Sequence, residues 1–450
     1  MSPRLRPTAL AISIGVVLAD SSIVTLGLPD ILQEFDGTVF GVSWVLTAFN
    51  LALAAAIVPA VILARGAAPE RGWGVGLVIF GIASLACASA DSEAVLIATR
   101  VVQALGGAMT IACAIEVIAR IEGSHHAAVP IWATAGTIGI AIGPAAGGAL
   151  TELLSWQAIF YVQVPLLVML PVAFMSTPGR PEPGPQSHGD LRPEAALALL
   201  SAGLTAALFL LVILLTEGWA LSPLAAAATI SAIPIAAFAA RWLIDRAGPP
   251  LSAALAGGIA VTGGLAALGV LPGASWALTL QPQILIGVGL ALALPVLTLA
   301  AVGRHDPRGS RAAETIAARH AGIVVGIVLL APLLSWQLET QRERAQESAT
   351  ALILDSPLPA ETKLALGTAI AERIDAADGR LPNVGPAFEV VSVPEGTSAA
   401  AYDELRDEIQ NQAERGATNA FSLPFLGAAA FALLSLIPIA RLRATEPEPL

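Results

Sequence analysis

The sequence predicts an all-α polytopic membrane protein with about twelve transmembrane helices in two six-helix lobes. Of its 450 residues, 56% are hydrophobic and only 13% are charged, whereas soluble domains carry about 25% charged residues. The hydrophobic residues form long uninterrupted runs, and about 18 such residues suffice to cross a bilayer as a helix. A polar stretch rich in Pro and Gly divides these runs into two sets. Helices satisfy their own backbone hydrogen bonds in lipid, which favours a helical bundle.

The apolar runs place six spans before the polar stretch and six after it. The predicted spans are 8–29, 42–64, 73–91, 94–119, 128–150, 158–177, 195–216, 224–243, 253–272, 277–302, 315–336 and 420–440. We therefore expect a first lobe at 1–177, a cytoplasmic linker at 178–194, five spans of a second lobe at 195–336, an extracytoplasmic segment at 337–418, and a last span with its cytoplasmic tail at 419–450.

The arginine residues predict the orientation in the membrane. The loops at 30–41 and 216–223 contain no Lys or Arg. Alternate loops on the other side, together with both termini, carry Arg4, Arg6, Arg65, Arg71, Arg120, Arg180, Arg192, Arg241, Arg246, Arg304, Arg308, Arg311, Arg441 and Arg443. Because Lys and Arg accumulate in cytoplasmic loops, both termini are predicted to be cytoplasmic, in a plasma or inner membrane.

Residues 337–418, here called the cap, are polar and lie between the last two predicted spans. Two sets of apolar residues recur at helical spacing, and Gly416 is a plausible helix stop. The sets are Leu366, Ile370 and Ile374, and Tyr402, Leu405 and Ile409. We expect a small helical segment outside the membrane that offers a surface for an extracytoplasmic protein partner. The alternative is a solvated spacer that binds nothing.

Composition and motifs exclude several classes of protein. A net charge of −11 argues against a nucleic-acid partner. Cys87 and Cys113 lie inside apolar runs and are expected to be buried hydrophobic residues, with neither a disulfide framework nor a metal-ligand pattern. The sequence contains no phosphate-binding loop, no His-Glu-x-x-His and no Gly-x-Ser-x-Gly. We therefore expect no enzyme and no cofactor, with an ion gradient as the energy source.

Charged residues inside predicted spans are candidates for function because burying them in lipid is costly. Asp20 lies roughly 18 Å along its helix from Thr8, near the middle of a ~30 Å hydrocarbon core. It is therefore a candidate proton carrier, or alternatively a structural acid paired with an arginine. Arg100 is the candidate partner, and Gln103 shares its helix face. The alternative for Arg100 is that it extends to the outer headgroups.

The spans contain further polar residues. Asn50 and Gln163 could line a central cavity or make hydrogen bonds between helices. Glu116 is expected to pair with Arg120 four residues later. His320 lies near the predicted start of its span, where no special role is expected.

The fifth predicted span carries Gly139, Gly143 and Gly147 at every fourth position. Such a stripe lets another helix approach closely. Pro144, within the stripe, permits a bend because it cannot donate a backbone hydrogen bond. Together with Gly148, these residues form either a plain packing surface or a hinge and seal.

The first six spans resemble the major facilitator superfamily, specifically its drug:proton antiporter branch, whose members usually have fourteen spans. Residues 19–29, Ala-Asp-Ser-Ser-Ile-Val-Thr-Leu-Gly-Leu-Pro, are similar to the first-span signature Leu-Asp-x-Thr-Ile-Val-Asn-Val-Ala-Leu-Pro. Residues 100–106 resemble the fourth-span Arg-x-x-Gln-Gly-x-Gly motif. Gly143-Pro144-x-x-Gly147-Gly148 matches the fifth-span antiporter motif, and residues 155–160 resemble the opening of the sixth span.

The resemblance implies a transporter that exposes a central cavity to each side of the membrane in turn. It also implies that Asp20 is the coupling acid, that Arg100 tunes its proton, and that the glycine motif seals the cavity. The expected function is proton-coupled export of a small molecule, lipophilic or cationic, with the lipid bilayer as the other partner.

The loop between the second and third spans departs from the family. Arg65 occupies the place of the aspartate in the family's Gly-x-Leu-Ala-Asp-Arg-x-Gly-Arg-Arg motif, so the charge is reversed. In the family this acid helps to lock the inner gate. The departure and the cap together leave open a non-transporting membrane scaffold or sensor that works through the cap. Proton-coupled uptake is a further alternative, because the sequence does not decide the direction of transport.

Overall fold

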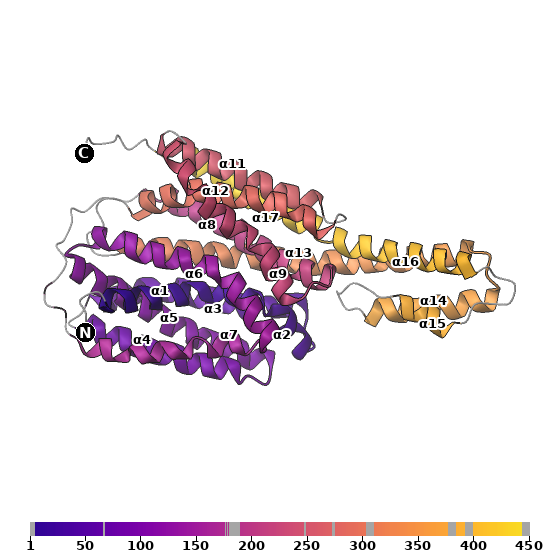
Figure 1. The fold of residues 1–450 in the computed structure, drawn as a ribbon, viewed down its shortest axis with the longest axis horizontal. Helices are drawn as coiled ribbons and strands as arrows, with labels where there is room; N and C mark the ends of the chain where they lie inside the picture. The colour runs from indigo at the N-terminus through magenta and orange to yellow at the C-terminus, as the bar shows by residue number, and fades with distance from the viewer. Residues whose placement is uncertain are drawn as a thin grey trace.

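The computed structural model describes residues 5–65, 68–175, 177, 179, 190–246, 249–271, 275–302, 310–376, 384–391 and 399–442. Within these residues all regular structure is helical, and the long helices lie side by side in one elongated bundle (Figure 1). Eleven of the described helices are long and apolar enough to cross a membrane, and the shorter apolar stretch Ala158–Phe174 adds another. The predicted all-α class with about twelve spans is confirmed.

The first half of the chain forms the lower part of the bundle in Figure 1. Its helices are α1 (Leu5–Thr25), α2 (Leu28–Glu34), α3 (Val39–Ala64), α4 (Pro69–Ala88), α5 (Glu93–Glu122), α6 (His125–Leu153), α7 (Ala158–Tyr161) and η1 (Val164–Phe174). Local sequence signals set several of these ends. The hydroxyls of Thr38 and Ser124 accept hydrogen bonds from the first turns of α3 and α6. Gly123, at φ +80°, ends α5 in a left-handed conformation.

Two spans of this half are shorter or more broken than predicted. The first was expected over 8–29, but α1 ends at Thr25 and Pro29 lies in the first turn of the separate helix α2. The sixth was expected over 158–177, but it divides into α7 and the tighter helix η1, with Pro165 in the first turn of η1. In both cases proline has no N–H for the residue four positions earlier, so the helix cannot continue unchanged.

The second half contains α8 (Arg192–Ile213), η2 (Leu214–Gly218), α9 (Pro223–Ile230), α10 (Ala232–Ala239), η3 (Ala240–Arg246), α11 (Pro250–Val270), η4 (Trp276–Thr279), α12 (Leu280–Val302), α13 (Ser310–Asp355), α14 (Ala360–Ala376), α15 (Gly385–Val390), α16 (Ala399–Asn419) and α17 (Ser422–Ala440). The eighth span was predicted to run unbroken over 224–243. It is interrupted after Ile230, because Pro234 cannot donate to the Ile230 carbonyl.

Helix α13 does not end at 336, where the eleventh span was predicted to end, but continues unbroken to Asp355. Residues 337–355 are mostly strong helix formers, and the first proline after them is Pro357. The returning helix α16 packs against α13, and α14 and α15 complete the cap. Gly416 was expected to stop a helix, but α16 passes through it to Asn419. Helix packing therefore outweighs the modest cost of one helical glycine.

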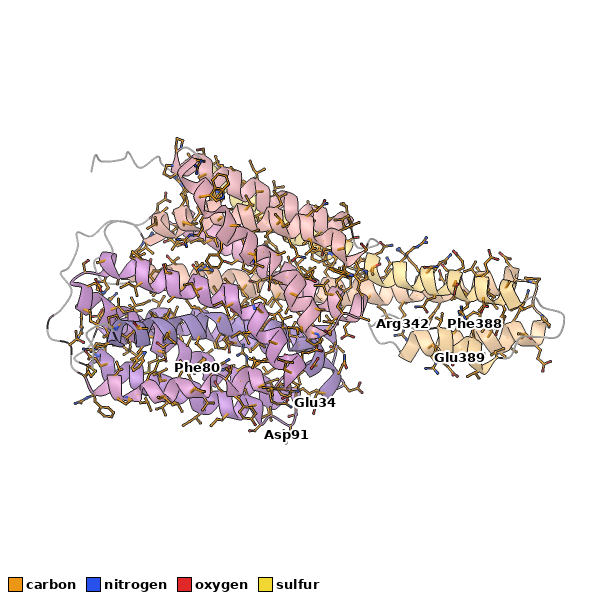
Figure 2. All side chains as sticks on the ribbon, viewed as in Figure 1. Glu34, Phe80, Asp91, Arg342, Phe388 and Glu389 are labelled. Atoms are coloured by element: carbon orange, nitrogen blue, oxygen red, sulfur yellow. The ribbon has the colours of Figure 1, made fainter. Side chains whose placement is uncertain are left out.

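The cap is helical, as predicted, and has a hydrophobic core of its own. The core includes Ile353, Leu358, Leu366, Ile370, Ile374, Phe388, Tyr402 and Ile409, with Leu405 partly buried against it. The Tyr402 hydroxyl donates to the Val391 carbonyl at 2.6 Å. Arg342, Phe388 and Glu389 lie in this projecting hairpin, while Glu34 and Asp91 mark the end of the bundle nearest to it, the cap end (Figure 2).

Helix α13 joins the two halves of the molecule. It packs against α8 of the second half and against α3 of the first half. Two large hydrophobic clusters make up the bundle. The one around Trp73, Phe49 and Phe80 also takes in Ala312, Ala313 and Ile316 from the start of α13. The core is therefore continuous across the boundary between the halves.

Candidate functional site

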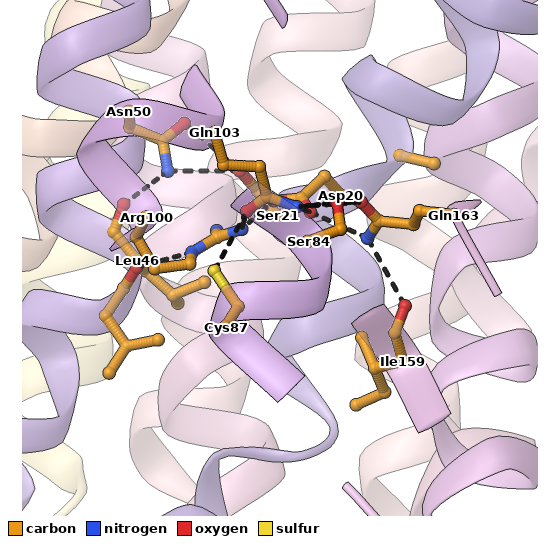
Figure 3. Close-up of polar contacts among 12 residues, drawn as sticks. Asp20, Ser21, Leu46, Asn50, Ser84, Cys87, Arg100, Gln103, Ile159 and Gln163 are labelled. Carbon is orange, nitrogen blue, oxygen red and sulfur yellow. Dashed lines mark hydrogen bonds and ion pairs between the residues drawn. The ribbon is translucent and has the colours of Figure 1, made fainter. Parts of the chain in front are cut away.

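Asp20 of α1 and Arg100 of α5 form an ion pair in the interior of the first half (Figure 3). Arg100 Nη1 lies 2.5 Å from Asp20 Oδ2, and both side chains are fully buried. The Asp20 and Arg100 positions are 80 residues apart in the chain, so the packing of α5 beside α1 creates the contact. Arg100 does not extend to the headgroups.

Two glutamines complete the surroundings of the Asp20 carboxylate. Gln163 Nε2 donates to Asp20 Oδ1 at 2.8 Å, and Gln103 Nε2 approaches the same oxygen at 3.4 Å. The Gln103 carbonyl oxygen accepts from Arg100 Nη1 at 2.6 Å, so Gln103 bridges the acid and the base. Gln163 lies between α7 and η1, where the sixth span is broken. That break therefore brings the amide into the site.

Ser84 of α4 belongs to the same cluster, although the sequence analysis missed it. Its hydroxyl accepts from Gln103 Nε2 at 2.9 Å and lies 3.2 Å from Gln163 Oε1. The Cys87 thiol is 3.8 Å from Gln103 Oε1. Both side chains are fully buried. A serine in an apolar run can also donate a hydrogen bond to a carbonyl of its own helix, as Ser84 does to the Phe80 carbonyl. The presence of a serine in the sequence therefore did not indicate the cluster.

Arg100 is further held by groups on α3. Its Nε donates to the Val45 carbonyl at 3.1 Å, and its guanidinium carbon lies 4.1 Å from the centre of the Phe49 ring. Nη2 is buried and has no hydrogen-bond partner in the part of the chain that the structure describes. The guanidinium therefore touches three helices of the first half and keeps one unused donor group.

Asn50 of α3 connects this region to the second half of the molecule. Its amide group donates to the Leu46 carbonyl at 2.8 Å and to the Ser21 hydroxyl at 3.1 Å. Its carbonyl oxygen lies 2.6 Å from His320 Nδ1 of α13. Because the amide faces Leu46, the oxygen faces His320, and Nδ1 is then the donor. Asn50 and Gln163 are fully buried and make interhelical hydrogen bonds, which was the second of their two predicted readings.

His320 has a larger part than the sequence analysis expected. It was placed near the start of its span, but α13 begins at Ser310, so His320 lies almost three turns inside the helix. It is buried and contacts the opposite half. The start of α13 was misjudged because the residues that open it are charged and polar.

The glycine motif packs α6 against α1. A Cβ added at Gly139, Gly143 or Gly147 would overlap the Gly15 carbonyl, the Ser22 hydroxyl or the Ile23 carbonyl respectively. Gly148 faces the second half instead, where an added Cβ would overlap Ala227 of α9. Pro144 lies within the continuous helix α6. The motif therefore makes two close helix contacts, one of them between the halves.

Further contacts between the halves lie at both ends of the bundle. At the cap end, Gln33 Nε2 donates to Glu217 Oε1 at 3.2 Å, and Glu152 lies beside the start of α9. Burial, and to a lesser degree the charge of Glu152, raises the pKa of Asp30, which lies in α2 outside the spans. At the opposite end, Arg65 Nη2 donates to Ser310 Oγ at 2.8 Å. Arg65 therefore contacts the other half at the position where the family motif carries an acid.

Helix α6 meets the second half near the cap end. It packs on α9, while α10, the continuation of α9 away from the cap, packs on α12. Glu116 pairs with Arg120 at 3.0 Å, as predicted, and also contacts His125 at 3.1 Å. Most of the linker at 178–194 lies outside the described residues.

The described residues contain no group of three or more His, Cys, Asp or Glu side chains placed to hold a metal ion. The polar cluster around Asp20 instead combines one acid, one base and neutral amides. Such a cluster can exchange a proton, or hold and release one charged group.

The sequence profile of the Major Facilitator Superfamily matches residues 10–336. The chain belongs to the Major Facilitator Superfamily. Over its whole length, the fold is similar to the crystal structure of a bacterial homologue of the human lysosomal transporter Spinster in an inward-facing, unoccupied conformation. The TM-score is 0.65 at 16% identity, and the match covers 98% of this chain and 99% of that one.

Several relatives within the superfamily are drug efflux proteins, in agreement with the resemblance to the drug:proton antiporter branch. The drug efflux pump JefA of Mycobacterium tuberculosis is 30% identical over 171 residues, which are 37% of this chain and 34% of the relative. The multidrug resistance protein Stp of the same species is 33% identical over 164 residues, 35% of this chain and 30% of Stp. The tetracenomycin C resistance and export protein of Streptomyces glaucescens is 31% identical over 188 residues, covering 40% and 35% of the two chains. The matched segment thus spans about a third of each relative.

Proposed function

We propose that the protein exports a small molecule by alternating access, in exchange for protons that bind at Asp20. One observation carries the proposal: a fully buried carboxylate is held by one arginine and two amides, at the meeting point of α1, α5 and the sixth span. An acid in the membrane interior is costly to retain, and proton relays are among its common uses.

The geometry supports a simple coupling step. Protonation of Asp20 removes the negative charge that holds Arg100 Nη1, so the ion pair is replaced by a weaker hydrogen bond from the charged guanidinium to a neutral carboxyl group. Arg100 is also bound to Val45 and stacked on Phe49 of α3. A change at the pair therefore reaches α3, which packs on α13 of the other half. Proton binding would bias the two halves between conformations as any ligand biases a two-state element.

The superfamily supports the remaining parts of the proposal. Its transporters are generally not enzymes and generally need no cofactor, so we infer that a proton gradient drives this one. The names of JefA, Stp and the tetracenomycin C export protein favour efflux. We further propose a cell-membrane location with both termini in the cytoplasm. Arg6 and Arg192 lie in the first turns of α1 and α8 and Arg441 follows α17, and these helix ends lie opposite the cap (Figure 1).

The test is proton movement in vesicles containing the purified protein, with a panel of small lipophilic molecules as candidate substrates. We expect substrate-induced proton flux in the wild type and none in Asp20→Asn, because the amide cannot take up a proton. The matched control is Asp91→Asn, which removes an exposed carboxylate at the cap end and should leave the flux unchanged. Undiminished pH-driven transport by Asp20→Asn would refute the coupling role.

A second candidate function is a membrane scaffold or sensor that acts through the cap. Two observations favour it: the cap has its own hydrophobic core, and α13 runs unbroken from the bundle into it. A protein partner bound to the cap would then act directly on the helix that joins the two halves. Proton-coupled uptake uses the same site with the opposite direction of substrate flow.

A further inference from the structure

Arg319 of α13 is a second arginine deep in the bundle, and no acid among the described residues pairs with it. It lies nine residues, or roughly 14 Å, beyond the start of α13 at Ser310. The side chain is partly buried. Within the part of the chain that the structure describes, it makes no hydrogen bond and no ion pair. A guanidinium in a low-dielectric interior normally has a partner.

The register of α13 places Arg319 between the two halves. Gly322 and Gly326, three and seven residues later, press against the carbonyls of Ala198 and Ala202 in α8. His320, the next residue, faces Asn50 of α3. Positions three and seven apart share one side of a helix. Arg319 therefore lies at the edge between the face of α13 that packs on α8 and the face of α13 that packs on α3. Those two helices belong to opposite halves of the molecule.

The acids of the spans are already held by other groups or lie at helix ends. Asp20 is bound by Arg100, and Glu116 by Arg120 and His125. Glu70 pairs with Arg6 near the end of the bundle away from the cap. Glu194 and Glu314 both lie against Arg311. The Asp20 pair is neutral overall, so among the described residues Arg319 leaves an uncompensated positive charge at the boundary between the halves.

We propose that Arg319 binds the anionic group of the transported molecule, so that the substrate is an amphiphile carrying a carboxylate, sulfonate or phosphate. A planar guanidinium binds such oxyanions through two parallel hydrogen bonds. The neighbouring His320 has Nδ1 bound to Asn50, and its Nε2 has no partner in the described chain. The inference replaces the cationic substrate that the family resemblance suggests. It rests on the proposed transport function for its biological meaning, but binding can be measured separately.

The experiment measures binding to the full-length protein in phosphatidylcholine nanodiscs. The probes are dansylate, a fluorescent sulfonate, and dansylamide, its uncharged analogue. We expect the wild type to bind dansylate about tenfold or more tightly than dansylamide. In Arg319→Gln this preference should disappear while dansylamide binding is unchanged. Arg319→Lys should keep part of it, because lysine retains the charge without the paired donors.

The control variant is Arg246→Gln, which removes an exposed arginine stacked on Trp242 and should leave both affinities unchanged. Equal binding of the two probes by the wild type, or an unchanged preference in Arg319→Gln, would overturn the proposal. If Arg319→Gln does not fold, the wild-type preference and the Arg319→Lys variant decide it. Nanodiscs with added phosphatidylglycerol distinguish the source of the anion. Competition with dansylate that depends on Arg319 assigns the site to an anionic lipid, and absence of competition assigns it to soluble amphiphiles.

Failure of this inference and failure of the proposed function give different results. If neutral or cationic compounds alone drive Asp20-dependent proton flux and Arg319→Gln transports them normally, Arg319 is not the substrate site although the exporter stands. If no compound moves protons but dansylate binding depends on Arg319, the anion site stands and the coupling proposal falls.

Discussion

At the scale of single residues, the site depends on the mutual neutralisation of Asp20 and Arg100. Neither side chain is exposed, and each has lost its hydration. The amides of Gln103 and Gln163 replace part of that hydration for the carboxylate. Desolvation of two charges can cost more than their attraction returns, so a buried pair is weak support for stability. Its retention is better explained by a functional need for a charge that can be switched.

The cost of an unpaired buried charge predicts that a single variant loses more stability than the double variant. Arg100→Gln leaves the Asp20 carboxylate buried without a cation, so we expect it to destabilise the protein by about 3–5 kcal/mol. Asp20→Asn with Arg100→Gln has no buried charge at this site and should recover most of the loss. Thermal unfolding in detergent measures both. A double variant no more stable than Arg100→Gln alone would contradict this account.

At the scale of elements, the α6 glycines set how closely three helices approach one another. Gly139, Gly143 and Gly147 leave room for the backbone and side chains of α1, and Gly148 leaves room for α9. Asp20 lies on the same helix that these glycines contact. The position of the carboxylate relative to Arg100 therefore depends on α6, although α6 supplies none of the polar groups that touch it.

The glycine stripe predicts the effect of one added methyl group. Gly147→Ala would drive its Cβ into the Ile23 carbonyl, and overpacking of this kind costs about 1–3 kcal/mol. We expect a lower unfolding temperature and slower transport. Gly263→Ala in α11 is the matched control, because its Cβ would meet only Leu285 at an ordinary 3.7 Å. Equal unfolding temperatures and equal transport rates of the two variants would show that the close approach of α1 and α6 limits neither stability nor transport.

At the scale of the whole molecule, α13 contacts both halves of the bundle and the cap. Its first turns pack into the core of the first half, its third turn carries Arg319 and His320, and its last turns belong to the cap. A rigid helix transmits displacement along its length. Movement between the halves would therefore also move the cap, and a partner bound to the cap would be displaced during the transport cycle.

Removing the cap separates the two candidate functions. Gln341 and Gly416 lie next to each other on α13 and α16, so a short Gly-Ser linker can replace residues 342–415 without straining the bundle. If the protein is an exporter, transport by the shortened chain should stay within about twofold of the wild type, because the cap has a core of its own. Vesicle assays of proton flux measure this. Loss of cellular function with full transport in vesicles would instead favour a partner bound at the cap.

Much of the architecture was predictable because lipid imposes one dominant rule on the sequence. Apolar runs must be helices in a membrane, so the spans, the two halves and the helical cap followed from composition and periodicity. Asp20, Arg100 and Gln103 stood out because charged and amide groups are rare in such runs. The errors in the prediction concern where helices begin and end. Prolines divided the sixth and eighth predicted spans, and polar helix formers extended α13 in both directions.

The tertiary structure alone decided which of these residues meet. Asp20 and Gln163 are separated by 143 positions, and Asn50 and His320 by 270. Nothing local in the chain encodes such contacts, because they arise from how whole helices pack. Packing also determined which arginine is neutralised and which is not. The sequence by itself determined that charged residues lie inside the apolar spans. The fold decided that, among the described residues, Arg100 has an acid within reach and Arg319 does not, because a partner must be close in space and not in sequence.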